Sequence, residues 1–465
     1  MKLLLVVLAA ALGLAVAGLA AWSARSDGDA PTATRAAAVK PAQVARAVTT
    51  SGLVHHLREL EAIADESGDT RAAGSEGYDR SVEYVLATLR AAGYDPKLQR
   101  FSVRASREVR PTTLERVAPE PERLQRGRDF VLLEYSGSGR VTAPVAPVDA
   151  AGTTSGCEDT DFAGFPDGAI ALMRRGGCFF AVKAENAEAA GAAAALVYNE
   201  GGPGRESPIS ATLVRPAIGI PVLGLSNDLG EELAAGTSAT FRVNADVDNS
   251  ALPTANLIAE LPGRADDGVV LLGAHLDSVA AGPGINDNGS GVAAVLEAAV
   301  QLRRLRARPE RSIRFAFWAA EELGLKGSRA YAESLDDPDE ISAVLNLDMI
   351  GSPNYARLVY EGEDPIEGAF RNWFEARELP VETVALAGRS DHAPFADLGI
   401  PTGGLFTGAD EPKTAPEERL FGGEAGEAHD ACYHQACDGL ANVDRAVLSQ
   451  MADAAAAVAL ELAGP

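Results

Sequence analysis

Apolar residues follow two different periods along the chain, and together these periods predict an α/β architecture. Helical spacing covers residues 53–63 and 78–89, and again the C-terminal stretch 443–462. From about residue 250 onward, short apolar runs alternate with helical stretches. The clearest of these runs are 269–272, 312–318 and 343–347. Such alternation is typical of a sheet covered by helices.

Between residues 127 and 246, a different sequence pattern interrupts this alternation. Its strand-like runs, such as 130–133 and 170–173, are separated by Gly- and Pro-containing turns, and it has one alanine-rich helix. It contains no histidine. We therefore interpret 127–246 as a β-rich module inserted into an α/β domain made of residues 49–126 and 247–465.

The N-terminus has the pattern of an export signal. Lys2 precedes an apolar run over residues 3–22, and Ala15-Val16-Ala17 matches a small-x-small cleavage site. We predict a signal peptide at 1–22, a linker or pro-segment at 23–48, and a secreted protein. The run is also long enough to span a bilayer, so a membrane-anchored form is the alternative.

Composition and charge limit the classes of function. The chain has 465 residues, of which 46% are hydrophobic and 23% charged, and this supports a large folded core. The formal net charge of −25 repels phosphate backbones and argues against nucleic-acid binding. Such acidity fits solubility outside a cell.

Four cysteines fall into two local pairs, Cys157 with Cys178 and Cys432 with Cys437. An even number of cysteines in an exported chain favours disulfide bonds. Free buried thiols are one alternative for both pairs. Zinc ligation by the second pair is another, although no further cysteine pair lies near it in the sequence.

Acidic and histidine residues follow three consecutive strand-like runs. His275 and Asp277 come after the first run, Glu321 and Glu322 after the second, and Asp348 after the third. Ligands of open α/β sheets bind beyond the carboxyl ends of the strands. We therefore expect these side chains to meet at one edge of the sheet.

Carboxylates together with imidazole suit zinc. Two close zinc ions need a carboxylate between them, and Asp287 is a candidate, although capping the helix that follows it is its ordinary role. Glu321 and Glu322 are adjacent, so the chain must turn for both to serve one site. One could then bind metal while the other acts as a general base.

Five motifs in this order resemble the secreted bacterial leucine aminopeptidases with two co-catalytic zincs. They are Ala274-His275-Leu276-Asp277-Ser278, Asn286-Asp287-Asn288-Gly289-Ser290-Gly291, Ala320-Glu321-Glu322-Leu323-Gly324, Asn346-Leu347-Asp348-Met349-Ile350-Gly351 and Cys432-Tyr433-His434. The resemblance covers nearly all of residues 50–465 and implies a zinc-exopeptidase-type mixed sheet sandwiched by helices. The inserted region resembles the protease-associated domain through Gly156-Cys157, Arg175-Gly176-Gly177-Cys178-Phe179 and Lys183.

The resemblance implies five metal ligands. His275 and Asp348 would bind one zinc, Glu322 and His434 the other, and Asp287 would bridge them. It leaves calcium open, because no calcium ligands can be matched in this chain.

Further roles are implied beside the metals. Glu321 would be the general base and then the acid, and Tyr433 would donate a hydrogen bond to the developing oxyanion. Asp277 would orient a histidine ligand, as metal-bound imidazoles usually require. Arg389 would line the site. Phe406 would form a wall of an apolar pocket, with ordinary core packing as its alternative.

The remaining histidines need separate interpretations. His392 looks like a ligand by its sequence context, but the resemblance assigns that role to the later histidine. We interpret His392 as structural near the site, and His429 as a loop residue. His55 and His56 lie in the first helix and are interpreted as surface or packing residues.

These assignments predict a zinc-dependent aminopeptidase that removes large apolar N-terminal residues from peptides or proteins by zinc-activated water attack, with Glu321 as base. One alternative is a carboxypeptidase or dipeptidase on the same scaffold, for which Arg389 is the candidate cationic anchor. Another is a non-catalytic binding protein, which should have lost ligands. The sequence leaves the natural substrates and the oligomeric state open.

Overall fold

The structure is a computed structural model, and it describes residues 38–149, 154–202, 204–213, 218–236, 238–265, 267–362, 365–386 and 388–464. The signal peptide predicted at 1–22 and residues 23–37 of the predicted linker lie outside the described residues.

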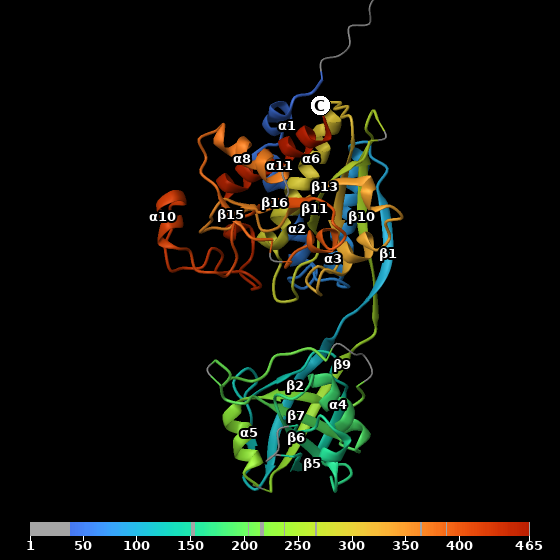
Figure 1. Cartoon of the computed structure of the whole chain (residues 1–465), viewed down its shortest axis with the longest axis vertical. Helices are drawn as coiled ribbons and strands as arrows, with labels where there is room; N and C mark the ends of the chain where they lie inside the picture. The colour runs from blue at the N-terminus through green and yellow to red at the C-terminus, as the bar shows by residue number, and fades with distance from the viewer. Residues whose placement is uncertain are drawn as a thin grey trace, which may run out of the picture. The chain divides into compact units, whose positions relative to one another are not determined.

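An eight-stranded mixed sheet forms the centre of the α/β domain (Figure 1). The strands β12, β11, β13 and β16 run parallel, and β10 and β1 continue the sheet in antiparallel pairing. In spatial order the strands are β1 (Lys97–Arg104), β10 (Ala251–Leu261), β12 (Ser312–Trp318), β11 (Val269–His275), β13 (Ile341–Leu347), β16 (Thr402–Phe406), β14 (Leu358–Tyr360) and β15 (Glu382–Val384).

Helices cover both faces of this sheet. They are α1 (Pro41–Ala47), α2 (Thr50–Asp65), α3 (Glu76–Ala91), α6 (Gly291–Arg304), α7 (Lys326–Ala332), α8 (Ile366–Glu375), α9 (Ala393–Ala396) and α11 (Arg445–Ala463). The short helix α10 (Ala415–Phe421) has no buried residue and lies outside these layers. Alternate side chains of β11 enter two hydrophobic cores, because neighbouring residues of a strand point to opposite faces. Val270 and Leu272 join a core with α6 and α11, whereas Leu271 packs with Tyr331 of α7 and Phe395 of α9. The predicted sheet sandwiched by helices is confirmed.

The helix α11 is a core element. It is long and apolar enough to cross a membrane by length and composition, but 67% of its apolar window is buried inside the protein. It packs against α1, α6 and α8 (Figure 1). Burial of a helix that is apolar all round accounts for its composition.

A second eight-stranded sheet forms the inserted module. In spatial order its strands are β3 (Glu122–Arg123), β2 (Arg107–Ala118), β9 (Thr240–Asp248), β5 (Gly139–Pro147), β6 (Ile170–Arg174), β7 (Ala194–Tyr198), β8 (Val222–Leu225) and β4 (Phe130–Leu132). The helices α4 (Phe180–Ala189) and α5 (Asn227–Ala234) pack against β7.

The strands β2 and β3 lie within residues 49–126, which the sequence assigned to the α/β domain, yet they belong to this second sheet. The long strand β2 pairs antiparallel with β9 along most of its length. Its mixed polar and apolar residues carry no clear period, so only the pairing assigns it to a sheet. We therefore propose 107–248, in place of 127–246, as the extent of the module.

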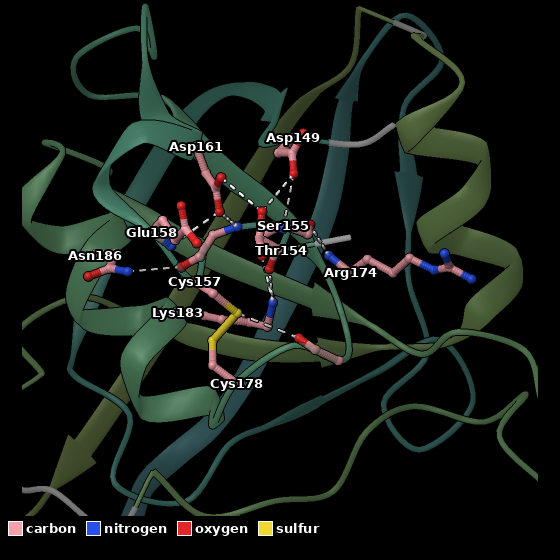
Figure 2. The surroundings of a disulfide bond; sticks show 12 residues. Asp149, Thr154, Ser155, Cys157, Glu158, Asp161, Arg174, Cys178, Lys183 and Asn186 are labelled. Carbon is pink, nitrogen blue, oxygen red and sulfur yellow. Dashed lines mark hydrogen bonds between the residues drawn. A yellow bond between two sulfur atoms is a disulfide. The ribbon is translucent and has the colours of Figure 1, made fainter. Parts of the chain in front are cut away.

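A disulfide bond and a buried lysine hold one loop of this module in place (Figure 2). Cys157 and Cys178 are joined with a Cα–Cα distance of 5.8 Å, as their pairing in the sequence predicted. The Lys183 ammonium is fully buried and donates to the carbonyls of Thr154 at 3.1 Å and Ser155 at 2.6 Å. Burial lowers the pKa of Lys183 to about 8.

Replacing this lysine should destabilise the module without affecting the chemistry. Lys183→Met leaves two buried carbonyl groups without a donor, which costs about 1–3 kcal/mol of unfolding free energy. Thermal unfolding should show the loss, with the exposed Lys97→Met as the control. Turnover of a small amide substrate by the folded variant should stay unchanged, and a large decrease would place catalytic groups inside the module.

Candidate metal centre

Three neighbouring parallel strands end at the same edge of the sheet and deliver the candidate ligands there. His275 is the last residue of β11, and Glu321 and Glu322 follow the end of β12. Asp348 follows the end of β13. Because β12, β11 and β13 are adjacent and parallel, these side chains converge.

Two sets of ligand atoms share one carboxylate. In the first set, His275 Nε2 lies 3.2 Å from Asp287 Oδ1 and 3.3 Å from Asp348 Oδ1. In the second, His434 Nε2 lies 3.2 Å from Asp287 Oδ2 and 3.1 Å from Glu322 Oε2. Each set fits within 4.8 Å, the spread expected around one metal ion. Asp287 therefore offers one oxygen to each set.

Helix capping does not explain Asp287. The helix α6 begins at Gly291 with Ser290 at its N-cap, and the Gly291 N–H donates to Asn288 Oδ1 at 3.0 Å rather than to Asp287. Asp287 lies before this helix, in the turn Ile285–Ser290, and is buried. Both of its oxygens face imidazole groups instead.

The adjacent glutamates reach one site because the chain turns after β12. Ala320 has a φ of 56°, and the backbone N–H groups of Glu321 and Glu322 donate to Asp277 at 3.1 and 3.3 Å. Glu322 then belongs to the second ligand set. Glu321 Oε2 lies 4.0 Å from His275 Nε2, and these two residues form a third possible set with Glu322.

Asp277 contacts His275 through its backbone. The Asp277 carbonyl oxygen lies 3.0 Å from His275 Nδ1, whereas the carboxylate oxygen is 3.9 Å away. The histidine is thus oriented by the carbonyl, and the carboxylate orders the turn that carries the two glutamates.

The electrostatics of the site favour a bound cation. Burial raises the pKa of Glu321 well above its usual value, and burial and Asp287 raise that of Glu322 to about 7. Burial lowers the pKa of His434, but its contacts with Asp287 and Glu322 outweigh this effect and raise it to about 10. Glu322 Oε1 is buried without a hydrogen-bond partner. This excess of carboxylate and the oxygen–nitrogen donor set fit zinc.

The ligand sets open into a cavity of about 150 Å³. Its lining includes Tyr433 and Phe406. The ring of Tyr433 stacks on that of His434 with centroids 3.9 Å apart, and the ring of Phe406 stacks on that of Tyr360 with centroids 6.2 Å apart. Arg389 lies at the exposed rim, where it pairs with a glutamate 3.2 Å away. Phe406 therefore forms part of the cavity wall.

The loop that carries Tyr433 and His434 is closed by the second disulfide. Cys432 and Cys437 are joined with a Cα–Cα distance of 5.3 Å, as their pairing in the sequence predicted. His434 has a φ of 57°, a left-handed conformation that L-residues adopt only when neighbouring structure holds them.

The sequence did not indicate several residues that line the site, among them Ser390 and Tyr360. The Ser390 hydroxyl donates to Asp348 Oδ2 at 2.6 Å, and Tyr360 lines the cavity. Ser390 lies two residues before His392, whose sequence context already indicated a place near the site. Tyr360 lies in a short apolar strand that has no such signal.

The other histidines stay outside the ligand sets. His392 packs against Tyr360, with ring centroids 5.1 Å apart, and burial lowers its pKa to about 4. His429 Nδ1 lies 2.8 Å from a loop carbonyl. His55 is exposed, whereas His56 is buried between Tyr84 and Glu297.

Fold and site together define an α/β protein whose strand ends gather histidine and carboxylate groups that could hold metal ions. The family model described as peptidase family M28 matches residues 256–459, and that of the PA domain matches residues 141–233. An aminopeptidase of Pseudomonas aeruginosa is 41% identical over 439 residues, covering 90% of this chain and 82% of that protein. The chain belongs to peptidase family M28 and carries a PA domain.

Further relatives are also described as aminopeptidases, as are solved structures of similar fold. The "Probable lipoprotein aminopeptidase LpqL" of Mycobacterium tuberculosis is 37% identical, with 90% of this chain and 86% of that protein covered. The aminopeptidase from Aneurinibacillus sp. strain AM-1 superposes with a TM-score of 0.69 at 26% identity, over 91% of this chain and 96% of that one. A zinc aminopeptidase from Bacillus subtilis has a TM-score of 0.66 at 26% identity, over 90% and 96%.

Proposed function

We propose that this chain is an aminopeptidase that holds two zinc ions and removes large apolar residues from the N-termini of peptides. The observation that carries the proposal is the carboxylate of Asp287, whose two oxygens belong to two separate ligand sets. Relatives described as aminopeptidases and zinc aminopeptidases support the same activity.

Five side chains would hold the zinc ions, in the two sets that share Asp287. His275 and Asp348 complete one set, and Glu322 and His434 complete the other. When bound, zinc supplies Lewis-acid polarisation of the peptide carbonyl and acidifies the attacking water.

The protein's own groups move the protons. Glu321 lies beside both ligand sets, and burial raises its pKa, which makes its carboxylate a stronger base. It can therefore take a proton from water and then give that proton to the leaving amine. The Tyr433 hydroxyl lies in the same cavity and keeps its proton, because burial raises its pKa, so it can donate to the developing oxyanion.

The cavity supports a preference for large apolar first residues. Phe406, Tyr360 and Met349 form a largely aromatic wall next to the ligand sets. A substrate ammonium would lie against Glu321 and Asp348, whose negative charge offsets its desolvation.

The surroundings of Arg389 weaken the carboxypeptidase alternative. This arginine is exposed and already pairs with Glu411, so its charge is screened from a substrate carboxylate. The ligand positions are all filled by suitable residues, which weakens the alternative of a non-catalytic binding protein.

Export is part of the proposal. The N-terminal apolar run and the two disulfides support an extracellular location, and the Mycobacterium tuberculosis relative is described as a lipoprotein. The net charge of −25 supports peptide rather than nucleic-acid partners.

Leucine p-nitroanilide and its N-acetyl form test the aminopeptidase proposal. Acetylation removes the ammonium charge, and the loss of one charged contact should lower kcat/KM by about 10- to 150-fold, corresponding to about 1.5–3 kcal/mol. Peptides with a blocked C-terminus should remain substrates. Equal cleavage of the free and acetylated compounds would contradict the proposal, and dependence on a free C-terminus would favour the carboxypeptidase.

A further inference from the structure

The backbone that leads to Asp287 is held from both sides by two buried, oppositely charged side chains. Arg71 comes from the segment between α2 and α3, and Asp438 directly follows the Cys432–Cys437 disulfide. Arg71 is fully buried and Asp438 is 2% exposed. Neither residue belongs to a ligand set.

Arg71 binds the carbonyl side of this backbone. Its Nε donates to Pro283 O at 2.8 Å and its Nη2 to Gly284 O at 2.6 Å, and Nη1 donates to Leu276 O. One guanidinium thus joins the loop after His275 to the turn before Asp287. The planar fork of arginine makes several such bonds at once, which an ammonium does with less directionality.

Asp438 binds the amide side of the same backbone. Its Oδ1 accepts the N–H of Asn286 at 2.8 Å, its Oδ2 accepts that of Asp287 at 2.9 Å, and its carbonyl accepts that of Ile285 at 2.9 Å. Three consecutive amides therefore point at one residue, which is also tied by the disulfide to the loop of His434.

Gly284 makes this close approach possible. It has a φ of 64°, and a Cβ there would lie 2.4 Å from the Asp287 carbonyl oxygen and 3.2 Å from Arg71 Nη2. Only glycine adopts this conformation without a clash.

We propose that Arg71 and Asp438 are positioning residues that set the location of the Asp287 carboxylate and thereby the affinity for both zinc ions. The inference rests on the proposed two-zinc function. Asp287 precedes the regular helix α6, and both of its side-chain oxygens face histidines. The neighbouring Asn286 and Asn288 anchor the turn to Asp430 and Leu347, but the N–H of Asp287 itself donates to Asp438. Burial lowers the pKa of Arg71 to about 10, and the nearby carboxylates, with Asp277 and Asp438 foremost, oppose this shift.

Asp438→Asn is the decisive variant, because it keeps the shape of the side chain. The asparagine amide has one acceptor oxygen, so one of the two N–H groups would face an NH₂ group instead. Loss of such a partner behind a metal ligand typically costs about 10- to 100-fold in metal affinity. Because Asp287 belongs to both ligand sets, both zinc ions should weaken together.

Matched controls separate positioning from general destabilisation. Asp453→Asn changes a half-buried carboxylate in α11, and Arg357→Met changes another buried arginine. Zinc affinity is measured by competition with a chelator, and thermal unfolding of the zinc-free proteins reports the fold. We expect Asp438→Asn and Arg71→Met to lose zinc affinity, and the controls to keep it at comparable unfolding temperatures.

The outcomes distinguish this inference from the proposed function. A wild-type protein that binds no zinc would contradict the proposed function itself. A folded Asp438→Asn protein that binds zinc like the wild type would overturn the positioning role, as would an equal loss in Asp453→Asn or the weakening of one zinc ion alone. If Arg71→Met does not fold, Asp438→Asn decides alone.

Discussion

Glu321→Gln should lower kcat by on the order of 10²- to 10⁴-fold while the protein keeps its fold and its zinc. The substitution removes the carboxylate proposed to accept the proton of water but preserves the size of the side chain. Glu321 lies outside the two ligand sets that share Asp287, so metal content should stay at the wild-type level. Steady-state kinetics with leucine p-nitroanilide and elemental analysis of the same preparation measure both quantities.

Glu322→Gln is the matched control for this prediction. It is the next residue, and its Oε2 lies 3.1 Å from His434 Nε2 within the second ligand set. This change should lower zinc affinity, and excess zinc should restore part of the activity. Near wild-type turnover of zinc-loaded Glu321→Gln would show that the roles of the two glutamates are assigned wrongly.

Removal of zinc should abolish turnover. A bound divalent ion contributes several kcal/mol to the stabilisation of developing charge, which corresponds to a decrease on the order of 10³-fold or more. Elemental analysis before chelation should give two zinc ions per chain, because Asp287 offers one oxygen to each of two ligand sets.

Re-addition of zinc is the control for the chelation experiment. Full recovery shows that the protein did not unfold, and thermal unfolding of the zinc-free protein checks this independently. Retention of full activity after exhaustive chelation would contradict a zinc mechanism. A single zinc ion at saturation would contradict the shared role of Asp287.

The α/β fold could be predicted from the sequence, and so could the gathering of candidate ligands at one edge of the sheet. Three apolar runs, each followed by a carboxylate or imidazole, predict converging strand ends, because parallel strands present their carboxyl ends at one edge. The convergence of His275 and Asp348 with the two glutamates could be predicted for this reason, whereas the division of roles between the glutamates rested on the family resemblance. The two cysteine pairs could also be predicted from the sequence, since the partners of each pair are at most 21 residues apart.

The tertiary structure alone decided the contacts between distant segments. The sequence placed β2 in the α/β domain, and only its pairing with β9 assigns it to the second sheet. From the sequence, Asp287 could either cap a helix or belong to two ligand sets. The structure distinguishes these roles, because His275 and His434, which lie on opposite sides of Asp287 in the sequence, both contact its carboxylate.

The same limit explains why Arg71 and Asp438 were not found from the sequence. Each acts through backbone groups that lie more than 100 residues away, at separations of 212 residues for Arg71–Pro283 and 152 for Asn286–Asp438. Backbone carbonyl and amide groups are present at every residue and leave no mark in the sequence. Their partners become visible only when folding brings a buried charge to a particular turn.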